Sequence, residues 1–336
     1  MSQWMTTFPG YAWLLSTVKK IFGNIIKTGP VPRHIGLIMD GNRRYARAHN
    51  IELKEGHNMG FESMASILEI LYECGVEQAT VYAFSIENFK RSSYEVKWLM
   101  DLAKQKFQQI TQHGELCEQY GVQIRILGNT SLLQPDVLKL LRQAEDITKN
   151  NKRAILNVCF PYTSRDEMTT AIKGIVKKST EVDDFIIDES TIDKFLYTKD
   201  APPLDLLIRT SGTYRLSDFL LWQSVSSQCS IVVIETLWPQ FNPYEMSKIL
   251  INWSFNKYWY GNSNGYTVRG NPDNLRLSND EDLEDDEPNA FTTSYNRNPI
   301  VEDEDSFDRD SDSDRVIDNE NDTVPSEESS INIKTA

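Results

Sequence analysis

Six short apolar runs alternate with longer segments of helical periodicity, and this alternation constrains the fold more than any other feature of the chain. Continuous apolar runs of this length are typical of strands that are buried on both faces of a sheet. The runs cover residues 35–40, 78–85, 122–129, 154–160, 204–210 and 230–236. The pattern predicts an α/β fold with a central, mostly parallel six-stranded sheet flanked by helices, in one domain over residues 30–262.

The negative charge of the chain is concentrated at one end. The formal net charge is -14, yet residues 271–336 hold 21 acidic and 5 basic residues, while the first 270 residues hold 28 acidic and 30 basic ones. We therefore predict that residues 263–336 form an acidic disordered tail, and that its charge says nothing about the partners of the folded part. The four cysteines lack metal-ligand spacing and a disulfide framework, so we expect reduced thiols in a cytosolic compartment.

The N-terminal segment, residues 1–29, is predicted to contain an amphipathic helix. Its apolar residues recur at helical spacing beside three lysines. Pro9, Gly10 and the lysines interrupt the apolar run well before the roughly 20 residues that a membrane span needs. Two interpretations stay open: a helix that lies on a membrane or guides a lipid into the core, and a helix that packs on the domain surface.

Polar clusters follow three of the predicted strands. Asp40 ends the first apolar run, SIENFKR follows the second, and RTSGTYRLSD follows the fifth. In parallel sheets, ligands bind beyond the carboxyl ends of the strands. We therefore expect the three clusters to meet at one edge of the sheet and to form one site.

The first cluster suits a phosphate held through a metal ion. Gly41 allows close approach of a ligand to the backbone, and Asn42, Arg43 and Arg44 open a helix whose free N–H groups favour an anion. Asp40 would repel a phosphate unless a cation lay between them, and Mg²⁺ takes one or two carboxylates together with diphosphate oxygens. The alternative is that Asp40 caps the helix and that the arginines are solvated.

The third cluster offers a second anion site. Arg209 and Arg215 bracket the turn of Ser211 and Gly212, and Ser217 adds a hydroxyl. Two arginine-rich sites around one acid predict two phosphorylated substrates that meet. The alternative is a polar surface loop. The second cluster could hydrogen-bond the reacting centre or merely cap a helix, and His57 could be a catalytic or a structural residue.

Together, these segments resemble the cis-prenyltransferases, the family of undecaprenyl and dehydrodolichyl diphosphate synthases. The resemblance runs from His34 to Trp238 through HIGLIMDGNRRYA, EGH, YAFSIENFKR, LDLLIRTSGTYRLSDFLLWQ and LWPQF. It implies the cis-prenyltransferase fold with an apolar product tunnel, for which Phe89, Trp98, Leu99, Leu102 and Phe107 are candidates; packing of the helix core explains these residues equally well. It also implies sequential head-to-tail cis-condensation of isopentenyl diphosphate onto an allylic diphosphate of the farnesyl type. The product would be a long polyprenyl diphosphate for dolichol and protein glycosylation.

The resemblance assigns roles to single residues. Asp40 corresponds to the aspartate that binds Mg²⁺ at the leaving diphosphate. The other catalytic positions implied are Asn42, His57, Ser85 and Asn88. The substrate-binding positions, taken from the motifs and from the clusters above, are Gly41, Arg43, Arg44, Glu87, Phe89, Arg91, Arg209, Ser211, Gly212, Arg215 and Ser217.

Three departures from the bacterial pattern bear on partners. Leu53 replaces an arginine, Gln228 replaces a metal-binding glutamate, and the nearest match to the C-terminal R-x-G motif is Val268-Arg269-Gly270, which does not fit. In the eukaryotic branch that motif comes from a catalytically silent, Nogo-B-receptor-like subunit, so we expect such a partner. A homodimer is a further option. We expect peripheral contact with the cytosolic face of the endoplasmic reticulum membrane or with lipid droplets, and no nucleic-acid partner.

Two other functions compete with this interpretation. A phosphohydrolase could use Asp40 as its nucleophile, but such enzymes usually carry a second acid two residues on, where this chain has Asn42. A non-catalytic scaffold subunit of a synthase should have lost its diphosphate ligands, yet Asp40, Arg44, Arg209 and Arg215 are all present.

Overall fold

The computed structural model describes residues 11–112, 120–182, 185–226, 228–260 and 267–269. The acidic tail predicted for residues 263–336 therefore lies almost entirely outside the described residues. Among those residues, no helix has both the length and the apolar content of a membrane span.

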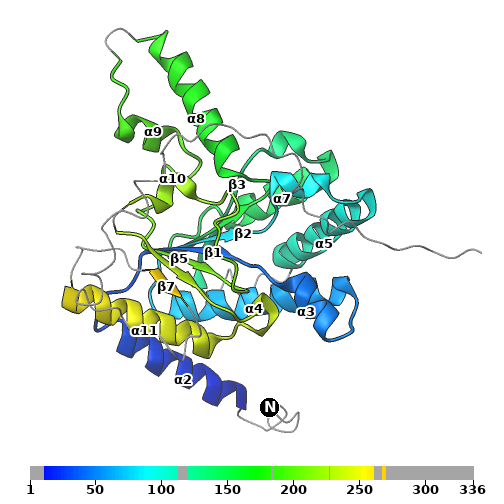
Figure 1. Cartoon of the computed structure of the whole chain (residues 1–336), viewed down its shortest axis with the longest axis vertical. Coiled ribbons are helices and arrows are strands. Elements are labelled where there is room, and N and C mark those ends of the chain that lie inside the picture. The colour runs from blue at the N-terminus through cyan, green and yellow to red at the C-terminus, as the bar shows by residue number, and fades with distance from the viewer. Residues whose placement is uncertain (1–10, 113–119, 183–184, 227, 261–266, 270–336) are drawn as a thin grey trace, which may run out of the picture. The chain divides into compact units, whose positions relative to one another are not determined.

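Seven parallel strands form one sheet in the order β3-β4-β2-β1-β5-β6-β7 (Figure 1). The strands are β1 (His34–Ile38), β2 (Gln78–Tyr82), β3 (Val122–Leu127), β4 (Ala154–Cys159), β5 (Leu206–Arg209), β6 (Ser230–Val233) and β7 (Thr267–Arg269). All six predicted strands are present, and every pairing is parallel. The seventh strand, β7, pairs with β6 and was not predicted, since its three residues lie in the stretch assigned to the tail.

Helices cover both faces of the sheet (Figure 1). The α-helices are α2 (Tyr11–Ile26), α3 (Asn42–Ala48), α4 (Leu53–Glu73), α5 (Ser93–Gln112), α7 (Pro135–Thr148), α8 (Ser164–Ser179), α9 (Glu189–Phe195), α10 (Leu221–Ser224) and α11 (Pro243–Tyr260). The short 3₁₀ helices are η1 (Ile86–Lys90), η2 (Thr130–Leu132) and η3 (Trp238–Gln240). The predicted α/β class is thus confirmed.

Successive residues of the strands feed two apolar clusters. Leu206 and Ile208 of β5 join the larger cluster with α4 and α11, whereas Leu207 between them joins a smaller cluster with Phe219 and Leu220. Because side chains alternate across a strand, the two clusters lie on opposite faces of the sheet. Double burial is the physical reason for the continuous apolar runs in the sequence.

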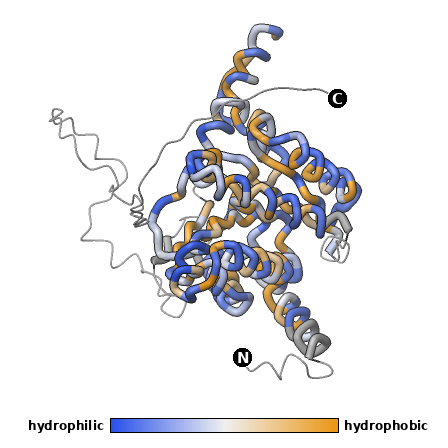
Figure 2. Tube along the Cα trace, turned by 90° about the vertical axis from the view of Figure 1, so that its right-hand side faces the viewer, coloured by the Kyte–Doolittle hydropathy of each residue, from blue (hydrophilic) through white to orange (hydrophobic). Residues whose placement is uncertain are grey.

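The N-terminal helix α2 packs on the domain surface against α4 and α11. Ile26 is buried in the larger cluster, Phe22 packs against it, and Lys19 forms an ion pair with Glu69 at 2.5 Å. Figure 2 follows the alternation of apolar and polar residues along the chain. Ile21 and Ile25 remain exposed, so packing on the domain leaves these two apolar side chains of α2 uncovered.

Replacing Gly23 by alanine should loosen the contact between α2 and α4. A Cβ atom at this position would lie 2.5 Å from the carbonyl oxygen of Glu73, so the helices must move apart. In a free helix, the same change adds about 1 kcal/mol of helix stability. We therefore expect Gly23→Ala to lower the midpoint of thermal unfolding and to speed proteolysis within α2. Ile21→Ala, on the exposed face of the same helix, is the control, and a raised midpoint in Gly23→Ala would show that α2 is not docked.

Candidate active site

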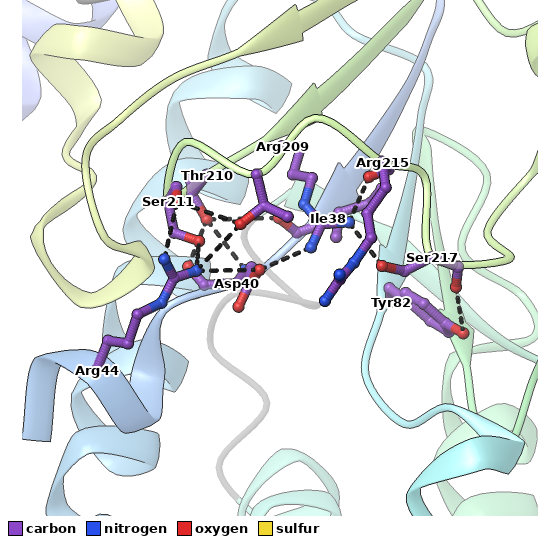
Figure 3. Close-up of polar contacts among 10 residues, drawn as sticks. Ile38, Asp40, Arg44, Tyr82, Arg209, Thr210, Ser211, Arg215 and Ser217 are labelled. Carbon is purple, nitrogen blue, oxygen red and sulfur yellow. Dashed lines mark hydrogen bonds and ion pairs between the residues drawn. The ribbon is translucent and has the colours of Figure 1, made fainter. Parts of the chain in front are cut away.

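The three polar clusters meet at one edge of the sheet, as predicted. They follow β2, β1 and β5, which are consecutive neighbours in the sheet. Ile38 of β1 pairs in register with Arg209 of β5, so the chain leaves both strands side by side. Figure 3 shows the residues of the first and third clusters converging at this point.

The backbone of Asp40 is held by two neighbouring segments. Its N–H donates to Thr210 Oγ1 at 3.0 Å, and Thr210 Oγ1 donates to the Asp40 carbonyl oxygen at 2.7 Å. The N–H of Trp238, at the start of η3, donates to the same carbonyl at 3.0 Å. Position and direction of the Asp40 side chain are thereby fixed before any ligand binds.

Two arginines share one oxygen of the Asp40 carboxylate. Arg209 donates to Oδ2 at 2.7 Å, and Arg44 donates to the same oxygen at 3.3 Å. Burial by itself raises the pKa of the carboxyl, but the hydrogen bond and charge of Arg209, helped by Arg44 and Ser211, outweigh burial and leave the pKa lowered. Asp40 is therefore an anion at neutral pH, and neither arginine donates to its other oxygen, Oδ1.

Arg209 is a buried cation, with only 3% of its side chain exposed. Its guanidinium also donates to Ser217 Oγ at 2.7 Å and to the carbonyl oxygen of Arg215. Burial lowers its pKa, opposed by Asp40 and supported by the nearby charges of Arg215 and Arg44. Removing one member of such a pair leaves an uncompensated buried charge, so Arg209 and Asp40 depend on each other.

Arg44 joins the third cluster rather than standing apart from it. It donates to the carbonyl oxygen of Ser211 at 3.1 Å, to Ser211 Oγ, and to Thr213 Oγ1 at 3.3 Å. The Ser211 turn is held in place because its N–H and that of Gly212 donate to the carbonyls of Thr236 and Ile234. The clusters that we expected as two separate anion sites thus share one hydrogen-bond network around Asp40.

The site carries more positive charge than its single acid balances. Arg43 and Arg215 are exposed, and neither forms an ion pair within the described part of the chain. In Figure 3 the Arg215 side chain extends from its loop toward the Asp40 side of the network. With Arg44 and Arg209 on one carboxylate and Arg215 beside Arg209, the positive charge favours an anionic ligand.

Gly41 and Asn42 are placed by close packing. Gly41 has a φ of +115°, and a Cβ atom there would lie 3.1 Å from Leu237, so glycine suits both the conformation and the space. Asn42 opens α3 with its side chain against Gly60 of α4, and its Oδ1 is buried without a hydrogen-bond partner among the described residues.

The second cluster is organised as a helix cap. Ser85 Oγ accepts a hydrogen bond from the Glu87 N–H at 3.1 Å, and Asn88 Oδ1 accepts one from the Ser85 N–H at 3.0 Å. The capping alternative is therefore present in the structure. Glu87 pairs with Lys90 at 2.5 Å, and Phe89 packs edge-on against Phe84.

His57 lies on α4 beside the helix that follows this cap. Its ring is 5.3 Å from that of Trp98, and Arg91 forms an ion pair with Glu95 at 2.7 Å. Burial, aided by the charges of Arg91 and Arg43, lowers the pKa of His57 to about 4, although Glu95 opposes this. His57 is therefore neutral at physiological pH. Phe107 is buried, and Phe89 and Leu99 pack against the apolar core, whereas the product tunnel stays a prediction.

Sequence reasoning missed several residues that hold the site. Thr210 braces Asp40, and Tyr82 donates to the carbonyl oxygen of Ser217 at 3.2 Å. Arg165, from the start of α8, pairs with Asp218 at 2.7 Å and reaches Glu87 at 3.5 Å. Thr210 and Asp218 lay within quoted motifs, but nothing in the sequence links Arg165 to them.

The residues present fit a magnesium ion that is bound jointly with a ligand. The described residues contain no group of three or more His, Cys, Asp or Glu side chains that could hold a metal by themselves. Asp40 offers one hard carboxylate oxygen that is free of both arginines. Mg²⁺ commonly takes one or two protein carboxylates and completes its octahedron with phosphate oxygens and water.

Comparisons with known proteins point to one family. Residues 38–261 match the family model described as "Putative undecaprenyl diphosphate synthase". A dehydrodolichyl diphosphate synthase complex subunit of Schizosaccharomyces pombe is 48% identical over 75% of this chain and 96% of its own length. A dehydrodolichyl diphosphate synthase complex subunit of Homo sapiens is 46% identical over 72% of this chain and 73% of its own.

A solved structure shares the fold. The crystal structure of lavandulyl diphosphate synthase from Lavandula x intermedia in complex with dimethylallyl diphosphate is 27% identical, with a TM-score of 0.61 over 67% of this chain and 95% of that one. With the family model, the relatives and this likeness in agreement, the chain belongs to the cis-prenyltransferase family.

Proposed function

We propose that this chain is the catalytic subunit of a dehydrodolichyl diphosphate synthase. It condenses isopentenyl diphosphate onto an allylic diphosphate, head to tail and with cis geometry, and repeats the step to build a long polyprenyl diphosphate. The observation that carries the proposal is the anionic Asp40, fixed between the buried Arg209 and the exposed Arg44, with more cations than acids beside it. The printed names of the S. pombe and human relatives support the same substrate class.

The chemistry needs what these residues offer. The bond between C1 of the allylic substrate and its diphosphate oxygen breaks, the π electrons of isopentenyl diphosphate form the new bond to C1, and a proton leaves the former isopentenyl unit. Arg43 and Arg44 would bind the leaving diphosphate, while Arg215 and Ser217 would bind the second substrate. Bound Mg²⁺, held by Asp40 and diphosphate oxygens, would neutralise charge on the leaving group.

The scaffold and phosphohydrolase alternatives gain no support. A scaffold has no need of a buried arginine that pairs with a lone acid, since a buried ion pair is costly unless its geometry is maintained. A phosphoryl-enzyme mechanism would place an acid near Asp40 as proton donor, but Asn42 occupies that position and turns toward Gly60.

We further propose that full activity needs an accessory, Nogo-B-receptor-like subunit that supplies the R-x-G motif. The names of the relatives describe them as complex subunits, and the chain has no matching motif of its own. We propose peripheral localisation at the endoplasmic reticulum membrane or lipid droplets, which the exposed Ile21 and Ile25 of α2 support.

Incubation of the chain with farnesyl diphosphate, labelled isopentenyl diphosphate and Mg²⁺ tests the activity and the partner together. We expect long-chain labelled lipid from the chain with its accessory subunit, and little from the chain alone. Chromatography of the extracted lipids would measure both the yield and the chain length. Full activity of the chain alone would overturn the partner proposal, and no product under either condition would overturn the proposed activity.

Asp40→Asn should reduce kcat at least about a hundredfold, because it removes the charge that binds the metal ion while leaving an acceptor for Arg209. Asp40→Ala should be equally inactive and less stable, because it also strands the buried guanidinium. Initial rates with the accessory subunit and thermal unfolding would separate the two effects.

Asp136→Ala is the matched control for these variants, since it removes an exposed acid paired with Lys104. It should leave both rate and stability nearly unchanged. If Asp40→Asn kept normal synthesis in the assembled complex, the scaffold interpretation would be correct.

His57 should make stability depend on pH between about 6.5 and 4. Its pKa falls to about 4 on folding, so the unfolded chain takes up the proton first and the fold loses stability as the pH drops through this window. His57→Gln should therefore flatten the difference in free energy of unfolding between pH 7 and pH 5. Urea unfolding at both pH values measures this, and His34, whose pKa is also lowered to about 4, stays in both proteins as an internal reference. An unchanged pH dependence would contradict the half-buried, neutral state of His57.

A further inference from the structure

The loop that carries Arg215 has an unusual backbone. Four residues other than glycine, in the stretch from residue 211 to residue 220, have a positive φ: Ser211, Ser217, Asp218 and Leu220. A positive φ is uncommon in residues other than glycine. Each such residue costs free energy, which contacts with the surrounding structure must compensate. Three of the four lie within residues 217–220, two to five residues after Arg215. Something must therefore fix this end of the loop.

The N-terminus of α8 fixes it through Asp218. The carbonyl oxygen of Asp218 accepts the N–H of Ser164 at 2.7 Å, and its carboxylate accepts the N–H of Arg165 at 3.1 Å and the Arg165 Nε–H at 2.7 Å. Ser164 Oγ in turn accepts the N–H of Leu221 at 2.9 Å. Asp218 thus caps a helix from a distant loop, where a negative charge is favoured by the helix dipole.

Ser217, the residue before Asp218, belongs to the site. Its hydroxyl oxygen accepts from Arg209, and its carbonyl oxygen accepts from Tyr82 at 3.2 Å. Phe219, on the other side of Asp218, is fully buried and stacks on the Tyr82 ring at 4.6 Å. A shift of Asp218 would therefore move Ser217 and the Arg215 backbone, to which Arg209 also donates.

We propose that Asp218 is a positioning residue for the second substrate, with Arg165 as its partner. It holds Arg215 and Ser217 at the spacing that a diphosphate requires, and it does so without touching the ligand. Its side chain is 13% exposed, whereas that of Arg165 is 70% exposed. We therefore expect loss of the Asp218 carboxylate to disturb the loop more than loss of the solvent-screened Arg165 guanidinium. This inference rests on the proposed function for the identity of the substrate, isopentenyl diphosphate.

The test uses Asp218→Asn, Asp218→Ala and Arg165→Ala in the full chain with its accessory subunit. Asp218→Asn keeps an acceptor for the Arg165 N–H but loses the charge. We expect the dissociation constant for isopentenyl diphosphate, by calorimetry, and its KM to rise about tenfold in Asp218→Ala and less in Asp218→Asn. Arg165→Ala should raise both constants about twofold to threefold, since an exposed pair contributes little. The KM for farnesyl diphosphate should stay within about twofold in all three variants, because its proposed ligands lie on α3.

Asp188→Ala is the matched structural control. Asp188 caps α9 through the N–H of Thr191 at 2.7 Å, so its loss removes a helix cap that has no contact with the site. It should lower the unfolding midpoint without changing either substrate constant. Lower stability of the Asp218 variants with unchanged constants, or equal rises for both substrates, would overturn the proposal. Absence of isopentenyl diphosphate binding in the wild type would overturn it too, whereas Asp218-dependent binding without condensation would sustain it and refute only the proposed function.

Discussion

The ion pair between Arg209 and Asp40 is the interaction on which the rest of the site depends. An almost wholly buried guanidinium is tolerated because a carboxylate lies 2.7 Å from Nη2 and because the Ser217 hydroxyl and the Arg215 carbonyl oxygen accept from Nη1. The carboxylate, in turn, stays ionised only because two arginines compensate its burial. Neither group can change place or charge alone. The pair therefore acts as a fixed point between β1 and β5. It joins the two segments that carry the other arginines of the site.

Sheet topology explains why two sets of cations lie beside this fixed point, as the two proposed substrates would require. The chain leaves β1 into α3, which carries Arg43 and Arg44, and leaves β5 into the loop that carries Arg215 and Ser217. Two strands that are neighbours in space but about 170 residues apart in sequence thus deliver two sets of cations to one acid. Thr210 and Trp238 hold the acid's backbone, so a ligand meets a site whose geometry already exists. Preorganisation of this kind lowers the cost of charge stabilisation during reaction.

Much of this arrangement could be predicted from sequence, because its causes are local. Double burial produces the continuous apolar runs, and the parallel order follows from their alternation with helices, so the edge shared by Asp40, Ser85 and Arg209 could be inferred before any coordinates. The ion pair of Arg165 with Asp218 could not be predicted, since it joins the start of one helix to a loop far along the chain. Neither residue type is distinctive in the sequence. The strand β7 escaped for another reason: three residues within a polar, acidic stretch give no periodicity to detect. The hydrogen bond from Arg44 to Ser211 could not be predicted either, because the sequence suggested two separate anion sites, whereas the folded chain forms one network.

The second cluster shows that capping and binding need not be alternatives. In the cap of η1, the acceptor of Asn88 is used by the Ser85 N–H, whereas its two amide hydrogens find no acceptor among the described residues. The cap uses the amide oxygen of Asn88 and leaves its amide hydrogens, and N–H donors are what a phosphate oxygen requires. At Asp218, likewise, the carboxylate accepts from the backbone N–H and the Nε–H of Arg165 at the N-terminus of α8. Because Asp218 pairs with α8 and with Arg165, it does not neutralise Arg215, which forms no ion pair within the described part of the chain.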